Sequence, residues 1–341
     1  MAHRYLALLL GFSLSITVMA CDSTDKGVYE GSYSINNLLA LSLLSGYSSV
    51  TGNLYIRRGS GGPGLPAPET NFINLEGLES LTSIGGDLII EYNNNLEDLT
   101  GLDNLTSVGG DLLIHANYSL TSILGLENLA SVGGRVEISN NNVLASLAGL
   151  ENLASIGETL VISVNEALTS LTGLEHITSI DGLRISYNDT LTSLTGLENL
   201  TSVGGDLTVK ENETLTSIAA LGNLSSVGNN LSIYSNIALT SLTGLESLTS
   251  VGNNLSIYYG PLTSLVGLEN LVTIGGNLEI YHNIYLTSLA AFANLALVGN
   301  DFKIYDNMKL CTSLAEELKD QVAADGGIGG EIVIEDNKTC D

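Results

Sequence analysis

Tryptophan is absent from this chain of 341 residues, and phenylalanine and proline each occur only 4 times. Basic residues are also scarce, because 11 lysines and arginines stand against 37 acidic residues and give a formal net charge of -26. Such a surface repels phosphate backbones and anionic lipid headgroups, which argues against nucleic acid as a partner. Hydrophobic residues still make up 44%. They are mainly Leu, Ile and Val, which suits thin and regular core layers.

Catalytic and metal-binding patterns are missing as well. The histidines are scattered along the chain, at His3, His115, His176 and His282. The sequence has no Cys/His zinc spacing and no G-x-S-x-G turn. Parallel β-helix enzymes that act on polysaccharides cluster their carboxylates on outward strand positions, whereas here such acids are isolated, as at Glu91, Glu137 and Glu279. We therefore predict a protein that is not an enzyme and needs no metal or cofactor.

The N-terminus has the pattern of an export signal. Residues 1–4 carry positive charge, and residues 6–18 are almost wholly apolar. This pattern is typical of a secretory signal, which we assign to residues 1–20. The run Val18-Met-Ala-Cys21 resembles a bacterial lipobox, which implies lipidation of Cys21 and a linker over residues 21–30. We expect an exported protein, anchored by lipid to a membrane of the bacterial cell envelope. An ordinary cleaved signal with an incidental cysteine is the alternative.

The cysteine count agrees with a lipidated N-terminus. The chain has 3 cysteines, an odd number for an exported protein, and lipidation of Cys21 leaves Cys311 and Cys340 as a pair. Their disulfide would close a loop of about 29 residues and seal the C-terminal end of the fold.

A repeat of about 24 residues runs through most of the chain. Its pattern is L-x-x-L-x-G-L-x-x-L-x-x-V-G-x-x-L-x-I-x-x-N, and residues 191–212 are a representative copy. Copies aligned on the apolar residue before the glycine follow at spacings of 24 residues, interrupted by two spacings of 23. The aligned residues are Ile84, Val108, Val132, Ile156, Ile180, Val203, Val227, Val251, Ile274 and Val298.

This repeat predicts an all-β fold. The L-x-I step alternates as a short strand does, and one coil cannot bury its own apolar face without neighbours above and below. We predict a right-handed parallel β-helix, a solenoid of about 13 rungs that occupies residues 31–341 as a single domain. Glycines beside the aligned residue mark a corner where positive φ is expected. A short helix over 314–324 and a capping strand at 332–334 complete a C-terminal cap, residues 311–341.

Two polar columns recur at fixed offsets in the repeat. An asparagine column is predicted to point inward and to satisfy the backbone of the corners. It consists of Asn93, Asn117, Asn141, Asn165, Asn188, Asn212, Asn236, Asn283, Asn307 and Asn337, interrupted at Gly59 and Gly260. An acidic column is predicted to form a solvated negative edge, with cation bridging as the alternative. It consists of Glu79, Asp103, Glu127, Glu151, Glu175, Glu198, Glu246 and Glu269.

An outward column at the end of each strand changes character along the rod. It holds Glu, His, Ser or Lys as far as Lys210, and then tyrosine in successive coils. One interpretation of the stacked tyrosines is a binding platform, because each ring buries much area and keeps a polar tip. The other is that they only stabilise neighbouring strands. The candidate ligand-binding residues are Tyr234, Tyr258, Tyr281, Tyr305, Tyr259 and His282.

The repeat resembles the receptor L-domain, a β-helix similar to leucine-rich repeats, through units such as Gly196-Leu-Glu-Asn-Leu-Thr-Ser-Val-Gly-Gly-Asp-Leu-Thr-Val-Lys-Glu-Asn212. Related repeats occur in bacterial surface lipoproteins, and the resemblance covers roughly residues 30–341. It implies non-enzymatic recognition through a sheet face or the loops beside it. The chain lacks the cysteine-rich modules, kinase and membrane span of receptors, so their ligand specificity is not implied.

We therefore expect a cell-envelope protein that binds a protein or a glycan through an outward sheet face. A purely structural or adhesive stalk without a discrete ligand site is the alternative. The identity of the ligand, the oligomeric state and the membrane leaflet do not follow from the sequence.

Overall fold

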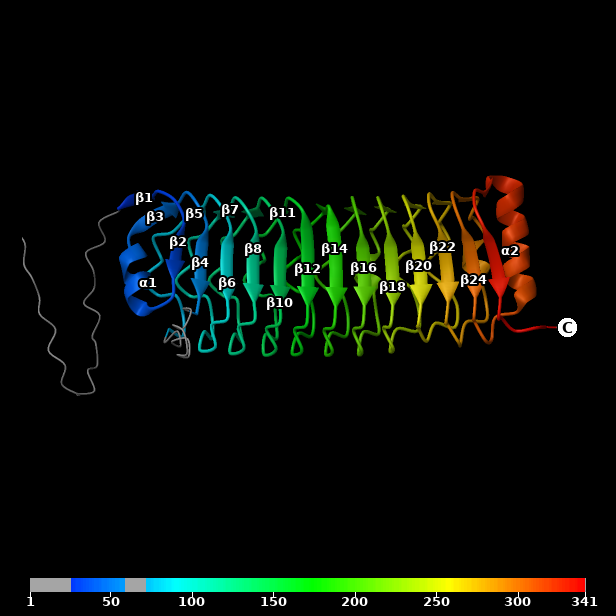
Figure 1. Cartoon of the computed structure of the whole chain (residues 1–341), viewed down its shortest axis with the longest axis horizontal. Helices are drawn as coiled ribbons and strands as arrows, with labels where there is room; N and C mark the ends of the chain where they lie inside the picture. The colour runs from blue at the N-terminus through cyan, green and yellow to red at the C-terminus, as the bar shows by residue number, and fades with distance from the viewer. Residues whose placement is uncertain (1–25, 59–71, 341) are drawn as a thin grey trace, which may run out of the picture.

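The protein is an elongated and gently curved rod. The computed structural model describes residues 26–58 and 72–340, and these form stacked coils whose strands run across the rod axis (Figure 1). The predicted parallel solenoid is confirmed, because all strand pairs along the rod are parallel and each coil adds one strand to a long sheet. The predicted signal, Cys21 and Gly59 lie outside the described residues.

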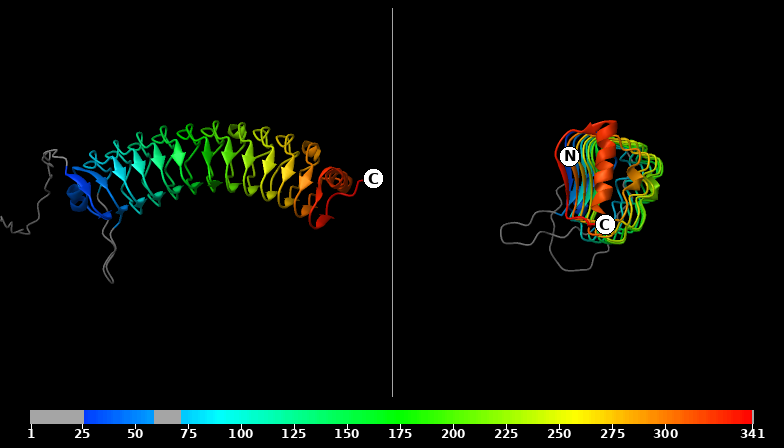
Figure 2. Two further views of the ribbon diagram at one scale, coloured as in Figure 1. Left: turned by 90° about the horizontal axis from the view of Figure 1, so that it is seen from above. Right: turned by 90° about the vertical axis from the view of Figure 1, so that its right-hand side faces the viewer.

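One 13-stranded sheet runs the length of the rod. Figure 2 shows that it lies on the inner, concave side of the curve. Its strands, in spatial order, are β2 (Tyr33–Ile35), β4 (Leu54–Arg57), β6 (Leu88–Glu91), β8 (Leu112–His115), β10 (Val136–Ser139), β12 (Thr159–Ser163), β14 (Gly182–Ser186), β16 (Leu207–Lys210), β18 (Leu231–Tyr234), β20 (Leu255–Tyr258), β22 (Leu278–Tyr281), β24 (Phe302–Tyr305) and β26 (Ile332–Glu335).

Shorter strands form a second side of each coil, in a 6-stranded and a 7-stranded sheet. The first consists of β1 (Gly27–Tyr29), β3 (Tyr47–Val50), β5 (Ser83–Ile84), β7 (Ser107–Val108), β9 (Ser131–Val132) and β11 (Ser155–Ile156). The second consists of β13 (Ser179–Ile180), β15 (Ser202–Val203), β17 (Ser226–Val227), β19 (Ser250–Val251), β21 (Thr273–Ile274), β23 (Leu297–Val298) and β25 (Gly327–Ile328). Because β1 already pairs with β3, the solenoid begins before residue 31 and the predicted linker was too long.

The core is a stack of nearly identical apolar layers. Leucines, isoleucines and valines at the repeat positions are almost completely buried in every coil. In the coil around β10, for example, Val136, Ile138, Leu144, Leu147 and Leu150 are all 0% exposed. Each fully buried side chain of this kind contributes about 1.5–3 kcal/mol relative to exposure, so the repeat pattern itself specifies the rod.

The corner glycines do not have the positive φ that we predicted for them. A Cβ atom on Gly109 or Gly133 would overlap the carbonyl oxygen of the residue one coil earlier, so the stacking distance excludes any side chain there. Positive φ occurs instead at the glycine of the G-L step, with φ 109° at both Gly101 and Gly125. It also occurs at a non-glycine residue between each long-sheet strand and the asparagine column, such as Ala116 with φ 53°.

The acidic column has a role that neither prediction anticipated. The backbone N–H of Gly125 donates to Oε2 of Glu127 at 2.8 Å, and Gly149 donates to Glu151 at the same distance. Each carboxylate therefore closes the positive-φ glycine turn of its own coil. This bond explains why an acid recurs two residues after the glycine.

Both ends of the rod are capped by helices. Helix α1 (Leu38–Leu44), which the sequence analysis missed, begins at Asn37, whose side chain accepts from the N–H of Ala40. At the other end, α2 (Thr312–Asp325) confirms the predicted C-terminal helix, and Cys311 and Cys340 form the predicted disulfide. Two 3-10 turns, η1 (Ala219–Leu221) and η2 (Ala290–Phe292), lie within their coils at the position of the G-L step. None of the helices in the described residues has the length and apolarity needed to cross a membrane.

Candidate functional site at the aromatic end of the long sheet

The tyrosines of the outward column form one continuous ladder on the concave sheet. Strands β18, β20, β22 and β24 pair so that Tyr234, Tyr258, Tyr281 and Tyr305 are direct neighbours. Successive ring centroids are 4.4, 4.5 and 5.0 Å apart, at interplanar angles of 10°, 8° and 2°. Each inner ring is therefore covered on both faces, and the ladder presents ring edges and hydroxyl groups to solvent.

Lys210 closes the N-terminal end of the ladder. Its Nζ lies 5.4 Å from the ring centroid of Tyr234 and 4.9 Å from that of Tyr187. Burial lowers the pKa of Lys210, but interactions with the two tyrosines outweigh it, and the net pKa is raised. The hydroxyl of Tyr187 in turn donates to Oε1 of Glu211 at 2.9 Å. The sequence analysis did not single out Tyr187 or Glu211.

The inner tyrosines resist ionisation. Burial, followed by the neighbouring Tyr234 and Tyr281, raises the pKa of Tyr258 well above its usual value of 10.0. Burial, followed by Tyr305 and Glu279, raises the pKa of Tyr281 to about 12. Their hydroxyl groups are consequently neutral hydrogen-bonding groups over the whole physiological pH range.

Tyr259 and His282 form a second aromatic layer beside the ladder. Both occupy the positive-φ position of their coil, with φ 52° and 54°, which turns their side chains away from the strand direction. Their rings are stacked with centroids 4.6 Å apart, and Tyr259 packs edge-on against Tyr258 at 5.7 Å. His282 Nδ1 contacts the carboxylate of Asp306. The structure thus brings all six predicted residues together on one surface.

A hollow, called the notch here, opens next to this second layer. It has a volume of about 520 Å³ and is lined by Ser235, Ile237, Tyr259, Gly260, Pro261, His282, Ile284 and Tyr285. The notch lies in one of the two coils with a spacing of 23 residues, where Gly260-Pro261 replaces the longer Asn-Ile-Ala of residues 236–238. The missing residue therefore leaves space between two complete corners.

The asparagine column is interrupted at the notch. The asparagines from Asn93 to Asn307 are buried, and away from the interruption each bonds to the next. Asn165 donates from its backbone N–H to Oδ1 of Asn188 at 3.1 Å, and Asn188 Nδ2 donates to the Ile162 carbonyl at 3.0 Å. The predicted inward role of this column is thus confirmed. Gly260 lacks the side-chain amide, and the buried Oδ1 of Asn283 has no hydrogen-bond partner among the described residues.

The residue that follows each asparagine of the column changes from polar to apolar in the coil where the tyrosines begin. The residue after the asparagine is mainly polar in earlier coils, namely Asn94, Tyr118, Asn142, Glu166, Asp189 and Glu213. It then becomes Ile237, Pro261, Ile284 and Met308, which we call the apolar row. Ile237, Ile284 and Met308 are 63%, 42% and 65% exposed. The sequence analysis missed this row, although the repeat alignment contains it.

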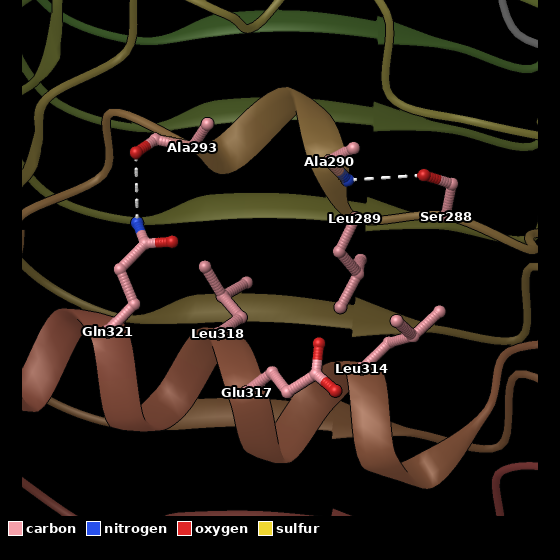
Figure 3. Close-up of a pocket in the computed structure, with 8 residues that line it drawn as sticks. All are labelled: Ser288, Leu289, Ala290, Ala293, Leu314, Glu317, Leu318 and Gln321. Carbon is pink, nitrogen blue, oxygen red and sulfur yellow. Dashed lines mark hydrogen bonds between the residues drawn. The ribbon is translucent and has the colours of Figure 1, made fainter.

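Two other hollows differ in character. The second coil with a spacing of 23 residues opens a hollow of about 500 Å³ at Asp181-Gly182, lined by Arg135, Arg184 and Asp206 among others. A crevice of about 280 Å³ separates α2 from η2 (Figure 3). There Gln321 Nε2 donates to the Ala293 carbonyl at 3.2 Å, so this crevice is the joint between the cap and the last coils.

Residues 48–144 and 80–171 match the family model of the Receptor L domain. Together the two matches span residues 48–171, which are thus similar to the Receptor L domain family. The predicted resemblance is thus confirmed for these coils, and the Receptor L domain is a non-catalytic, ligand-binding domain on a solenoid. The matched Receptor L domain segment ends before the aromatic ladder begins, although the same coil geometry continues through it. No curated protein matches the chain.

Proposed function

We propose that this protein is a non-enzymatic recognition protein that binds a protein partner at the C-terminal third of its concave sheet. The simultaneous change of two columns carries this proposal. At the coil of β18 the outward strand position becomes tyrosine and the neighbouring corner becomes apolar. The core does not change there, because the inward leucines and isoleucines continue without interruption. Folding therefore does not require the new surface, whereas a partner would.

The surface chemistry favours a protein over a glycan. Exposed isoleucine, methionine and tyrosine in contiguous positions are typical of the centre of a protein interface. Sugar rings stack on open aromatic faces, but the faces of Tyr258 and Tyr281 are covered by their neighbours in the ladder. The net charge of -26 further favours a partner with a basic rim around an apolar centre.

Envelope attachment is the second part of the proposal. The lipobox-like run that ends at Cys21 supports a diacylglyceryl anchor, with the rod as an extracytoplasmic recognition element. Mass spectrometry of the mature N-terminus tests it. We expect a lipid-modified peptide that starts at Cys21, and an unmodified peptide that starts at another residue would contradict the anchor.

Selection of random peptides displayed on phage against the full-length protein tests the binding function. Selected peptides should bind the triple variant Ile237→Asp/Ile284→Asp/Met308→Asp at least about tenfold more weakly, because a charge replaces each apolar contact. The matched control is Leu124→Asp/Val143→Asp, whose residues are 45% and 42% exposed in the N-terminal half. It should bind as the unchanged protein does.

Two outcomes would contradict the proposed function. Equal loss in the variant and the control would show that the apolar row has no special role. Binding of an oligosaccharide from a glycan array that disappears on Tyr259→Ala, with no peptide selected, would assign the surface to a glycan. A protein that binds neither class would be the stalk considered above.

A further inference from the structure

The notch is a gap in the row of corners, at the coil of Gly260-Pro261. Its volume of about 520 Å³ lies within the range of pockets that enclose a ligand group. Its walls are formed by the apolar row on two sides, Ile237 and Ile284, and by the rings of Tyr259 and Tyr285. Lys309 lies over the Tyr285 ring with Nζ 4.7 Å from the centroid. An aromatic group is therefore the natural occupant.

The neutral form of His282 offers the notch a hydrogen-bond acceptor. A carboxylate only accepts, so the contact between Asp306 and His282 places the proton of a neutral imidazole on Nδ1. Nε2, on the far side of the ring, is then an acceptor. In the described part of the chain, neither backbone nor side chain donates to Nε2. An occupant that brings an N–H or O–H group would satisfy it.

The interruption of the asparagine column is an independent sign of an incomplete site. The side chain of Asn283 is fully buried and its Oδ1 has no partner within residues 26–58 and 72–340, and a Cβ atom on Gly260 would lie 3.3 Å from that oxygen. A buried carbonyl oxygen without a donor costs about 1–3 kcal/mol. Among the described residues, Oδ1 of Asn93, which follows the other interruption of the column at Gly59, also has no partner, so this cost arises where a glycine interrupts the column.

We infer that the notch is an anchor pocket for one tryptophan or tyrosine side chain of the protein partner, with its N–H or O–H donated to Nε2 of His282. This inference rests on the proposed function and deepens it. The shared walls place the anchor at the middle of the apolar row, between Ile237 and Ile284. Buried aromatic anchors in such a central position dominate the energy of protein interfaces.

Small aromatic probes test the pocket without knowledge of the partner. Indole and 1-methylindole are titrated into the full-length protein, and the methyl resonances of Ile237 and Ile284 are followed by NMR. Indole should bind saturably and roughly three- to tenfold more tightly than 1-methylindole, which lacks the N–H donor. His282→Phe keeps a ring in the stack and should remove this difference between the probes while indole still binds.

A filled notch provides the decisive variant. Replacing Gly260-Pro261 with Asn-Ile-Ala, the sequence of residues 236–238, restores a full corner and should weaken indole at least about tenfold. The matched control Asn142→Ile/Val143→Ala creates the same corner sequence in an N-terminal coil and should not change indole binding. Peptides with Trp or Tyr, selected as above, should lose affinity for the filled variant by a similar factor.

The outcomes separate this inference from the proposed function. If selected peptides depend on the apolar row but neither they nor indole respond to the filled notch, the anchor pocket is wrong and the interface stands. If indole and 1-methylindole bind equally, the role of His282 is wrong. If indole occupies the notch but peptides ignore both the notch and the row, the pocket takes a free small molecule, and both proposals about a protein partner fail.

Discussion

Alanine substitutions at two positions of the asparagine column should have different costs. Asn188 and Asn283 are both buried and both donate from Nδ2 to a strand carbonyl, Ile162 at 3.0 Å and Ile257 at 2.9 Å. They differ at Oδ1. That of Asn188 accepts the backbone N–H of Asn165 at 3.1 Å, whereas that of Asn283 has no partner in the part of the chain that the structure describes.

The magnitude follows from this one difference. Loss of the donated bonds is common to the two variants and costs about 1–2 kcal/mol in free energy of unfolding. Asn188→Ala additionally leaves the buried N–H of Asn165 without an acceptor, which costs about 1–3 kcal/mol more. Asn283→Ala leaves no such donor. Asn188→Ala should therefore be the more destabilising variant by about 1–3 kcal/mol.

Urea denaturation at neutral pH measures both costs, and the slope with urea shows whether the two variants unfold over the same part of the rod. Solenoids can unfold in sections, so hydrogen exchange of the amides next to each substituted coil supplies the local free energy. Equal losses, or a larger loss for Asn283→Ala, would refute the view that the column stabilises the rod by passing bonds from coil to coil.

Three other changes have expected outcomes. Replacing Cys311 and Cys340 with alanine opens a loop with a sequence separation of 29, and hydrogen exchange should show a loss of about 3–4 kcal/mol confined to the C-terminal cap. Since the pKa of Tyr281 is raised from 10.0 to about 12, its contribution to stability is complete below pH 10 and is lost as the pH rises toward 12; Tyr281→Phe should lessen this alkaline loss, and phenolate absorbance at high pH checks the titration. Gly133→Ala should lower the unfolding free energy by about 2 kcal/mol or more, measured by urea denaturation, whereas Gly222→Ala, whose Cβ atom would lie 3.3 Å from its nearest neighbour, should change it little.

The architecture could be predicted because one period controls it. Every coil buries the same apolar positions, so alignment on one residue such as Val203 reveals strands, core and the inward asparagines together. Helix α1 could not be predicted in this way, because it occurs once and its leucines have no periodic counterpart. Its N-cap at Asn37 is a local signal that does not recur, so an alignment of the repeats does not reveal it.

The candidate site was only partly predictable for a related reason. The tyrosines stand at a repeated position, and their stacking follows from the register of the sheet. The notch arises because the corner at Gly260-Pro261 is one residue shorter than its neighbours. The sequence shows the shorter spacing, but the resulting space becomes visible only in the structure. The stacking of Tyr259 on His282 likewise depends on a positive-φ position that the pattern of apolar residues does not reveal.

The location of a bound protein ligand tests the central claim most directly. A spin label on a selected peptide broadens the methyl resonances of nearby residues in the full-length protein. Broadening should be strongest at Ile237, Ile284 and Met308, and absent at Ile89 and Leu113, which lie on the same concave sheet in the N-terminal half. Broadening centred on Ile89 and Leu113 would place recognition on the coils that match the Receptor L domain and would contradict a site at the aromatic end.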